Sequence, residues 1–308
     1  GRRPDLMASY VRGPARVSVP ATSANLGPGF DTLGIALDLR DELEGEVLDH
    51  GGLEVRVEGE GSGEVALDET HLVVRAMHAA FDATGGRPPG LRLTCRNVIP
   101  HARGLGSSSA AIVGGIVLAR ELVEGGRTLL PDDAAFELAA RLEGHPDNVA
   151  PALYGGFTIA GHTTDAFWAT ASPVAPEIGA VVFVPPDGVS TVAARGLLPE
   201  TVPHADAAAN AANAALLVAA LAGQWQRLAQ ATGDLLHQDY REPAMPQSLG
   251  LVRALRADDY AAVVSGAGPT VLVLTTPDVD VETLGARCPA HWTTRVLRLG
   301  VVGASVVG

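Results

Sequence analysis

Hydrophobic and polar positions alternate in short segments along the chain, with longer apolar stretches between them. Alternation predicts strands over residues 16–20 and 53–58. Further strands are expected over residues 91–97, 155–160, 178–184, 260–265, 270–275 and 293–299. Helices are expected over residues 71–81, 108–123, 132–143, 204–221 and 224–237. Both halves mix strands and helices without regular alternation, which favours an α+β fold in two layers.

The irregular segment over residues 161–176 is the expected domain boundary and divides the chain into residues 1–162 and 163–308. No stretch of about 18 consecutive apolar residues occurs, so a membrane-spanning helix is not expected. Residues 1–5 carry charge without the apolar core of an export signal. Cys95 and Cys288 are too far apart for a disulfide framework, which fits the cytoplasm.

Charge and composition exclude several classes of protein. The net charge is −13, and no basic run is longer than two residues, which disfavours a nucleic-acid partner. All 22 basic residues are arginine. Without lysine, the chain has no Walker A lysine, no amine for a Schiff base and no β3 lysine of a protein kinase.

A loop rich in glycine and serine joins the strand expected over residues 91–97 to the following helix. Its glycines allow the backbone to approach a ligand, and N–H groups at a helix N-terminus favour an anion. Its serines could ligate Mg²⁺, or one of them could simply cap the helix. In a chain without lysine, Arg103 could add positive charge. The loop comprises Pro100, His101, Ala102, Arg103, Gly104, Leu105, Gly106, Ser107, Ser108, Ser109 and Ala110.

Residues 20–34 are interpreted as a loop after an edge strand, with short polar side chains and glycines. The amide of Asn25 and the carboxylate of Asp31 lie six residues apart and could hold an ammonium and a hydroxyl group. A turn stabilised by an Asx side chain explains the same residues.

The segment over residues 142–151 places Glu143 at the end of a helix and Asp147 in the tight turn that follows. Glu143 offers the hard oxygen atoms that suit Mg²⁺, and Asp147 is a candidate acceptor for the proton of an attacking hydroxyl. The alternative is structural: Gly144 ends the helix, and Asp147 caps the next one.

A second glycine turn lies over residues 265–270, between two expected strands. It could support the first glycine loop from below. A turn without any ligand contact explains it equally well.

Together and in this order, the four segments resemble the motifs of the GHMP kinase superfamily. Pro-x3-Gly-Leu-Gly-Ser-Ser-Ser-Ala is similar to its phosphate loop, and Ser-Gly-Ala-Gly-Pro-Thr to its C-terminal glycine motif. Ala-Thr-Ser-Ala-Asn-Leu-Gly-Pro-Gly-Phe-Asp, Glu-Gly-His-Pro-Asp-Asn-Val-Ala-Pro and residues 189–199 and 239–243 resemble the branch that phosphorylates homoserine. The resemblance covers roughly residues 14–299.

The resemblance implies an N-terminal domain like domain 2 of ribosomal protein S5 and a ferredoxin-like C-terminal domain. It implies transfer of a phosphoryl group from ATP to the side-chain hydroxyl of L-homoserine, with Mg²⁺, for threonine synthesis. The glycine loop would hold the nucleotide, with Ser108 and Glu143 at the metal. The implied substrate-binding residues are Asn25, Asp31, Asn148, Thr191, Arg195 and Arg241.

Asp147, Asn148 and Arg195 are the implied catalytic residues. Planar guanidinium groups of Arg195 and Arg241 suit the substrate carboxylate, and Asp31 suits its ammonium. Both arginines are expected at the surface. The role of Asp147 as a base stays open, because phosphoryl transfer depends mostly on positioning and charge.

Two rival functions remain at this point. One is a kinase of the same superfamily that acts on another small alcohol, and the other is an inactive sensor of ATP or an amino acid. The oligomeric state is open, with a homodimer among the options.

Overall fold

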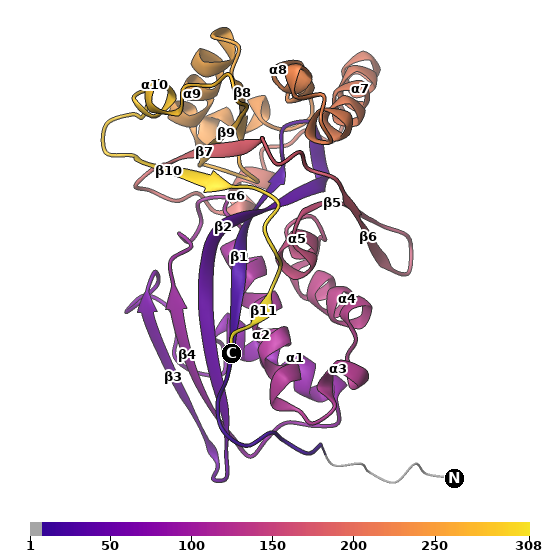
Figure 1. Cartoon of the computed structure of the whole chain (residues 1–308), viewed down its shortest axis with the longest axis vertical. Helices are drawn as coiled ribbons and strands as arrows, with labels where there is room; N and C mark the ends of the chain where they lie inside the picture. The colour runs from indigo at the N-terminus through magenta and orange to yellow at the C-terminus, as the bar shows by residue number, and fades with distance from the viewer. Residues whose placement is uncertain (1–7) are drawn as a thin grey trace.

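The computed structural model describes residues 8–308, which form two β-sheets covered by helices (Figure 1). Residues 1–5, in which no export signal is expected, lie outside this range. The strands are β1 (Ala15–Asn25), β2 (Gly29–Leu48), β3 (Gly52–Gly59), β4 (Gly90–Asn97), β5 (Phe157–His162), β6 (Phe167–Ser172), β7 (Gly179–Val184), β8 (Ala261–Val264), β9 (Val271–Thr275), β10 (Thr293–Arg298) and β11 (Ser305–Val306). The α-helices are α1 (Leu72–Ala83), α2 (Ser107–Leu122), α3 (Gly126–Leu129), α4 (Asp132–Glu143), α5 (Val149–Tyr154), α6 (Thr191–Arg195), α7 (His204–Leu221), α8 (Leu228–Ala231), α9 (Pro246–Ala257) and α10 (Val281–Gly285). Two 3₁₀ helices are η1 (Trp225–Arg227) and η2 (Asp239–Ala244).

The first sheet has the strand order β11-β1-β2-β4-β3, and β5 joins β2 to β6. β3 and β4 run parallel, whereas β1 and β2 form a long antiparallel ladder. β1 is buried from Val17 to its end, because it has a strand on each side and is covered on its faces. Helices α1 to α5 lie on one side of the sheet (Figure 1), and α2 contacts β1, β2, α1 and α4. This central position explains why α2 is apolar nearly all round.

The second sheet has the antiparallel order β10-β7-β9-β8. Along the chain, β7, α9, β8, β9, α10 and β10 give the strand–helix–strand–strand–helix–strand order of a ferredoxin-like domain. Val181 and Phe183 of β7 pack into one core, and Ala180 and Val182 into the core shared with the first sheet. Because side chains alternate along a strand, the sheet is buried on both faces. The expected α+β fold with two domains is confirmed.

The division of the chain between residues 162 and 163 stays a prediction. Strand pairing runs across this position. β6 pairs with β5 from Phe157–Ser172 to His162–Phe167, so the segment expected to be irregular contains a strand of the first sheet. β11 also returns to the first sheet, where Val306 faces Val17 of β1.

Two other expectations are wrong. Residues 20–34 are not a loop after an edge strand: β1 continues to Asn25, and only residues 26–28 separate it from β2. Residues 224–237 do not form one helix, because the Asp234 carboxylate accepts the N–H groups of residues 236–238 and so competes with helical hydrogen bonds. Over residues 8–308, none of the helices has both the length and the apolar character needed to cross a membrane.

Candidate active site

The first glycine loop, residues 100–110, leads from β4 directly into α2. The loop is fixed to β1 by a hydrogen bond from Thr22 N to the Leu105 carbonyl oxygen, at 3.0 Å. Gly106 is the N-cap of α2 with φ +70°, and no side chain caps the helix there. The first N–H groups of an α-helix have no partner within the helix, so this uncapped end is suited to an anion. The capping alternative for the serines is therefore excluded.

The second glycine turn, residues 265–270, supports the first loop directly. Ser265 Oγ donates to the Gly104 carbonyl oxygen at 2.6 Å, and Thr270 N donates to the Arg103 carbonyl oxygen at 3.2 Å. Gly104 has φ +76°, and a Cβ there would clash with the Ser265 carbonyl oxygen and lie 2.9 Å from Gly268 N. The close approach of two backbones requires glycine at this position.

The Arg103 side chain is occupied by backbone carbonyl groups. Its Nε donates to Pro185 at 3.2 Å, its Nη1 to His101 at 2.6 Å and its Nη2 to Pro186. These bonds tie the glycine loop to the segment after β7. They use three of the five N–H donors of Arg103, so one N–H on each Nη atom has no bond in this set.

A cavity of about 380 Å³ lies beside the start of α2. Ser107 and Ser108 line it at the glycine loop, and most of its remaining wall is apolar. Asp41 adds a carboxylate, whose Oδ1 accepts hydrogen bonds from the backbone N–H groups of Val98 and Ile99 at 2.7 and 2.9 Å. Burial raises the pKa of Asp41 to about 6. The cavity has the size and apolar character of a small-molecule site.

Ser108 and Glu143 meet at the start of α2. Ser108 Oγ donates to Glu143 Oε1 at 2.7 Å, and burial raises the pKa of Glu143. Within residues 8–308, Glu143 Oε2 and Ser109 Oγ are buried without a hydrogen-bond partner. The same part of the chain contains no group of three or more His, Cys, Asp or Glu that could hold a metal ion. The residues therefore fit a hard cation that takes its other oxygen ligands from a bound phosphate, as Mg²⁺ does in kinase sites. Gly144 also ends α4 as its C-cap, so the structural interpretation of Gly144 is confirmed, and the role of Glu143 at a metal stays a prediction.

Asp147 and Asn148 link the glycine loop to β1. Thr22 Oγ1 donates to Asn148 Oδ1 at 2.7 Å, and a Cβ on Gly106 would lie 3.2 Å from that oxygen. Asp147 is 4% exposed and its Oδ1 accepts the N–H of Asn148 at 2.8 Å. His145 lies 3.6 Å from the same oxygen, and Asp147 raises the pKa of His145. Asn148, not Asp147, is the N-cap of α5.

Asn25 at the end of β1 and Asp31 near the start of β2 flank the turn between these strands and have unusual backbone conformations, with φ +70° and +57°. Asn25 Oδ1 accepts the N–H of Asp31 at 3.0 Å, so an Asx side chain stabilises this region, but the bond spans six residues where an Asx turn spans two. Asn25 Nδ2 donates to the Gly266 carbonyl oxygen at 3.0 Å. The Asp31 carboxylate accepts two hydrogen bonds from Arg195, at 2.7 and 3.1 Å. Strain of this kind is characteristic of sites where a side chain must be held in one direction.

Arg241 is buried, contrary to the expectation of an exposed side chain. It is 2% exposed, and its Nε and Nη1 have no hydrogen-bond partner among the residues that the structure describes. Desolvation, with a smaller effect of Arg195, lowers the pKa of Arg241 to about 10. Arg195 is 41% exposed at its side chain. Nε and Nη1 of the buried Arg241 guanidinium together carry three N–H donors that an anion can use.

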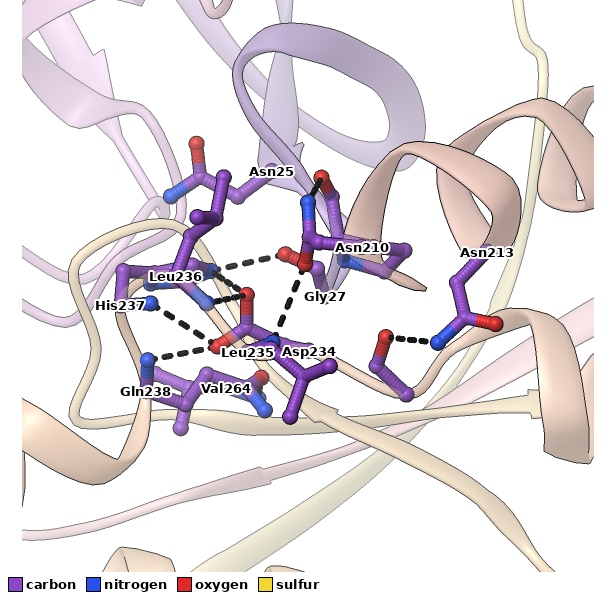
Figure 2. A network of polar contacts seen from close by, with 12 residues as sticks. Asn25, Gly27, Asn210, Asn213, Asp234, Leu235, Leu236, His237, Gln238 and Val264 are labelled. Atoms are coloured by element: carbon purple, nitrogen blue, oxygen red, sulfur yellow. Dashed lines mark hydrogen bonds and ion pairs between the residues drawn. The ribbon is translucent and has the colours of Figure 1, made fainter. Parts of the chain in front are cut away.

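A buried polar network joins the turn between β1 and β2 to the C-terminal domain, and Figure 2 shows its members. Asp234 accepts the backbone N–H groups of residues 236–238. His237 is fully buried, and its Nε2 donates to the Gly27 carbonyl oxygen at 2.8 Å. Asn210 Nδ2 donates to the next carbonyl oxygen, that of residue 28, at 2.8 Å. The network fixes the position of the turn that Asn25 and Asp31 flank.

The structure brings most of the predicted site residues together. Asp31 and Asp147 act on the pKa of both Arg195 and Arg241, whose guanidinium groups face the same region. Thr191 is exposed and lies one helical turn before Arg195 on α6. The sequence analysis missed the roles of Thr22, Phe30, His145 and His237, which lie in or beside the recognised motifs. The contacts of Thr22, Phe30 and His237 join segments that are distant in sequence, so only the three-dimensional arrangement identifies them, whereas His145 contacts Asp147 within one turn.

Two family models match the chain. The model of the GHMP kinases N terminal domain matches residues 71–156, and that of the GHMP kinases C terminal matches residues 206–294. The first match contains α2, the glycine loop and Glu143, and the second contains Arg241 and the second glycine turn.

Individual relatives match over almost the whole chain. Homoserine kinase from Streptomyces avermitilis is 52% identical over 292 residues, which cover 95% of each chain. Homoserine kinase from Clavibacter michiganensis subsp. michiganensis is 49% identical over 94% of this chain and 93% of its own. The crystal structure of homoserine kinase from Cytophaga hutchinsonii aligns with a TM-score of 0.82 at 27% identity, over 98% of this chain and all of the other. The chain therefore belongs to the GHMP kinase superfamily and, within it, to the homoserine kinases.

Proposed function

We propose that the enzyme transfers the γ-phosphoryl group of ATP to the side-chain hydroxyl of L-homoserine and releases O-phospho-L-homoserine and ADP. The product would serve threonine biosynthesis. The observation that carries this choice of substrate is the buried guanidinium of Arg241, whose Nε and Nη1 have no partner among residues 8–308. A guanidinium in this position favours an acceptor with a carboxylate over a sugar or an isoprenoid alcohol.

The charges around Arg241 suit the two ends of an amino acid. The Asp31 carboxylate has lone pairs beyond the two that bind Arg195, so it can also accept the substrate ammonium. Arg241 would bind the substrate carboxylate, and Arg195 would add a second positive charge beside it. Asn25 holds Asp31 in place, and Thr191 would contribute a hydroxyl from α6.

The acceptor hydroxyl would lie beside Asn148, which contacts both β1 and the glycine loop. This contact brings the acceptor close to the uncapped start of α2, where backbone N–H groups would bind the phosphates of ATP. Asp147 would accept or orient the hydroxyl proton, and the nearby Arg195 would offset developing negative charge. The nucleoside of ATP would occupy the cavity of about 380 Å³.

Ser108 and Glu143 would hold Mg²⁺, because the orphaned oxygen atoms there lack a positive partner. When bound, Mg²⁺ neutralises the phosphate charge that develops during transfer. Glu143 itself keeps Ser108 Oγ directed toward the phosphates by accepting its hydrogen bond. A cytoplasmic location and a homodimer stay predictions.

Initial rates of ADP release with Mg·ATP test the proposal directly. The panel contains L-homoserine, its α-amide, 4-hydroxybutyrate, L-serine and mevalonate at equal concentrations. The highest kcat/KM is expected for L-homoserine. The α-amide lacks the charge that Arg241 would bind, and 4-hydroxybutyrate lacks the ammonium for Asp31. Turnover of mevalonate or of the α-amide as efficient as that of homoserine would contradict the proposed substrate.

A further inference from the structure

Phe30, the second residue of β2, lies at the centre of a group of charged and aromatic side chains beside the turn between β1 and β2. The Cζ atom of Arg195 is 5.4 Å from the centroid of the Phe30 ring, and that of Arg241 is 5.9 Å away. The imidazole of His237 stacks on Phe30 with a centroid distance of 5.2 Å and an angle of 25° between the rings. One phenyl ring thus contacts both guanidinium groups of the proposed carboxylate site.

The two guanidinium groups repel each other, and the carboxylates of Asp31 and Asp147 offset part of this repulsion. Arg195 contributes to lowering the pKa of Arg241, which is the direction expected for two like charges. Arg195 is held on one side by Asp31, whereas Arg241 retains Nε and Nη1 without a partner in the described part of the chain. The electron-rich face of an aromatic ring attracts a guanidinium within about 6 Å without using its N–H donors. Such a contact can hold Arg241 and still leave those donors for a ligand.

His237 keeps the phenyl ring in place. Its Nε2 donates to the Gly27 carbonyl oxygen at 2.8 Å, three residues before Phe30, so the imidazole and the turn are fixed to each other (Figure 2). The side chain is fully buried, and burial lowers its pKa, so the ring is neutral and adds no further positive charge. Asp234 in turn fixes the backbone of His237 by accepting its N–H at 3.1 Å.

We propose that Phe30, supported by the stacked ring of His237, is a positioning residue that sets the place and spacing of the guanidinium groups of Arg195 and Arg241 for the substrate carboxylate. This inference rests on the proposed function, because it assigns the two arginines to that carboxylate. Phe30 itself touches the arginines and would not take part in the transfer.

The test compares Phe30→Leu with Phe30→Tyr, which retains an aromatic face, and with Phe167→Leu as a matched control. Phe167 on β6 also pairs with a histidine, His162, at a centroid distance of 6.1 Å, but it lies outside the proposed site. Loss of two cation–π contacts predicts a rise of about 5- to 30-fold in the KM for homoserine in Phe30→Leu. The KM for ATP should stay within about twofold, because no ATP-binding group contacts the ring in this assignment. Phe30→Tyr should keep the KM for homoserine near the value of the parent enzyme. Phe167→Leu should leave the KM for homoserine and the KM for ATP unchanged.

A second measurement does not depend on catalysis. In protein labelled with ¹⁵N-arginine, the Nε–H signals of Arg195 and Arg241 should carry a ring-current shift from Phe30. This shift should disappear in Phe30→Leu and persist in Phe167→Leu. Phe30→Met provides the same comparison if the leucine variant does not fold.

The outcomes separate the two proposals. A rise in both KM values together with a fall in Tm, or unchanged Nε–H signals, would show that Phe30 only packs the turn and would overturn the positioning role. If the parent enzyme fails to phosphorylate homoserine, the proposed function fails. The Nε–H signals then still decide whether Phe30 positions the two guanidinium groups.

Discussion

Replacement of Arg241 by methionine is expected to stabilise the protein while it weakens binding of homoserine. Methionine is similar in length, fills an irregular apolar space and needs no hydrogen bond. Arg241 is 2% exposed, and two of its nitrogen atoms have no partner in residues 8–308. The variant therefore removes a buried charge whose hydrogen bonds the protein does not satisfy by itself.

The size of the stability effect follows from the pKa of Arg241, which is lowered from 12.5 to about 10. At 1.36 kcal/mol per pKa unit, the folded protein disfavours the charged side chain by about 3 kcal/mol. The cost applies at every pH below about 10, since a base with a lowered pKa destabilises the fold wherever it is charged. Loss of the contact with Phe30 offsets about 0.5–1 kcal/mol. The free energy of unfolding should rise by about 1–3 kcal/mol, and Tm by a few degrees.

The effect on the substrate has the opposite sign. In the proposed site, Nε and Nη1 of Arg241 each donate one charge-assisted hydrogen bond to the substrate carboxylate. The Arg241→Met variant loses about 1.5–3 kcal/mol of binding free energy for each bond, which predicts a rise of about 10²- to 10⁴-fold in the KM for homoserine. The matched control is Arg87→Met, which removes an exposed ion pair with Asp82 and should change neither KM nor stability by much. Calorimetric melting at pH 7.5 and initial rates of ADP release give both quantities. A fall in Tm together with an unchanged KM for homoserine would refute the reasoning.

Three further changes test other parts of the site. Glu143→Gln keeps a hydrogen-bond acceptor but loses the charge, so the Mg²⁺ concentration for half-maximal rate should rise about 10- to 100-fold while Tm stays nearly constant. An unchanged Mg²⁺ requirement would show that Glu143 does not bind the metal. Asp41→Asn keeps the acceptor for two N–H groups but cannot ionise. The pKa of Asp41 is about 6 in the folded protein and 3.8 in the unfolded chain, so the parent loses stability as the pH rises through this range. In urea unfolding, the free energy of unfolding of the parent relative to the variant should fall by up to about 3 kcal/mol between about pH 4 and pH 6. A pH-independent difference would contradict that assignment. Gly104→Ala should lower the free energy of unfolding by about 1–3 kcal/mol and weaken ATP binding, because its Cβ would meet the Ser265 carbonyl oxygen. The control Gly266→Ala should cost less, because the nearest atom to its Cβ would be 3.4 Å away. Equal effects of the two variants in melting and ATP titration would count against the contact of Gly104 with Ser265.

The places of the glycine loop and of Glu143 in the fold could be predicted, because each depends on residue types close together in the sequence. A glycine turn that enters an apolar helix specifies an anion site whatever surrounds it, and Glu143 ends a helix with clear boundaries. The second glycine turn could be predicted from its residues, but not its contact with the first glycine loop. That contact depends on the hydrogen bond from Ser265 Oγ to the Gly104 carbonyl oxygen.

The burial of Arg241 could not be predicted, because its neighbours in sequence are polar and place it in a short 3₁₀ helix. What buries it is packing against the turn between β1 and β2, about two hundred residues earlier, including Phe30. The strand β2 was not predicted at all, for a related reason. Its first residues carry the polar and glycine positions of the substrate motif, which hide the alternation that continues to Leu48.

The return of the chain to its first sheet has a consequence for the order of folding during synthesis. The ladder of β1 closes only when Ser305 and Val306 pair with Ser18 and Val17. The Arg40 side chain donates hydrogen bonds to the carbonyl groups of Val302 and Gly303 at 2.7 Å each, and these bonds also form only after the last residues have been synthesised. When the N-terminal half has been synthesised, the edge of β1 is therefore still open, and it can pair with another chain until the last segment emerges. Slow translation of the C-terminal domain should thus increase aggregation of the nascent chain, although every residue of the N-terminal motifs has already been made.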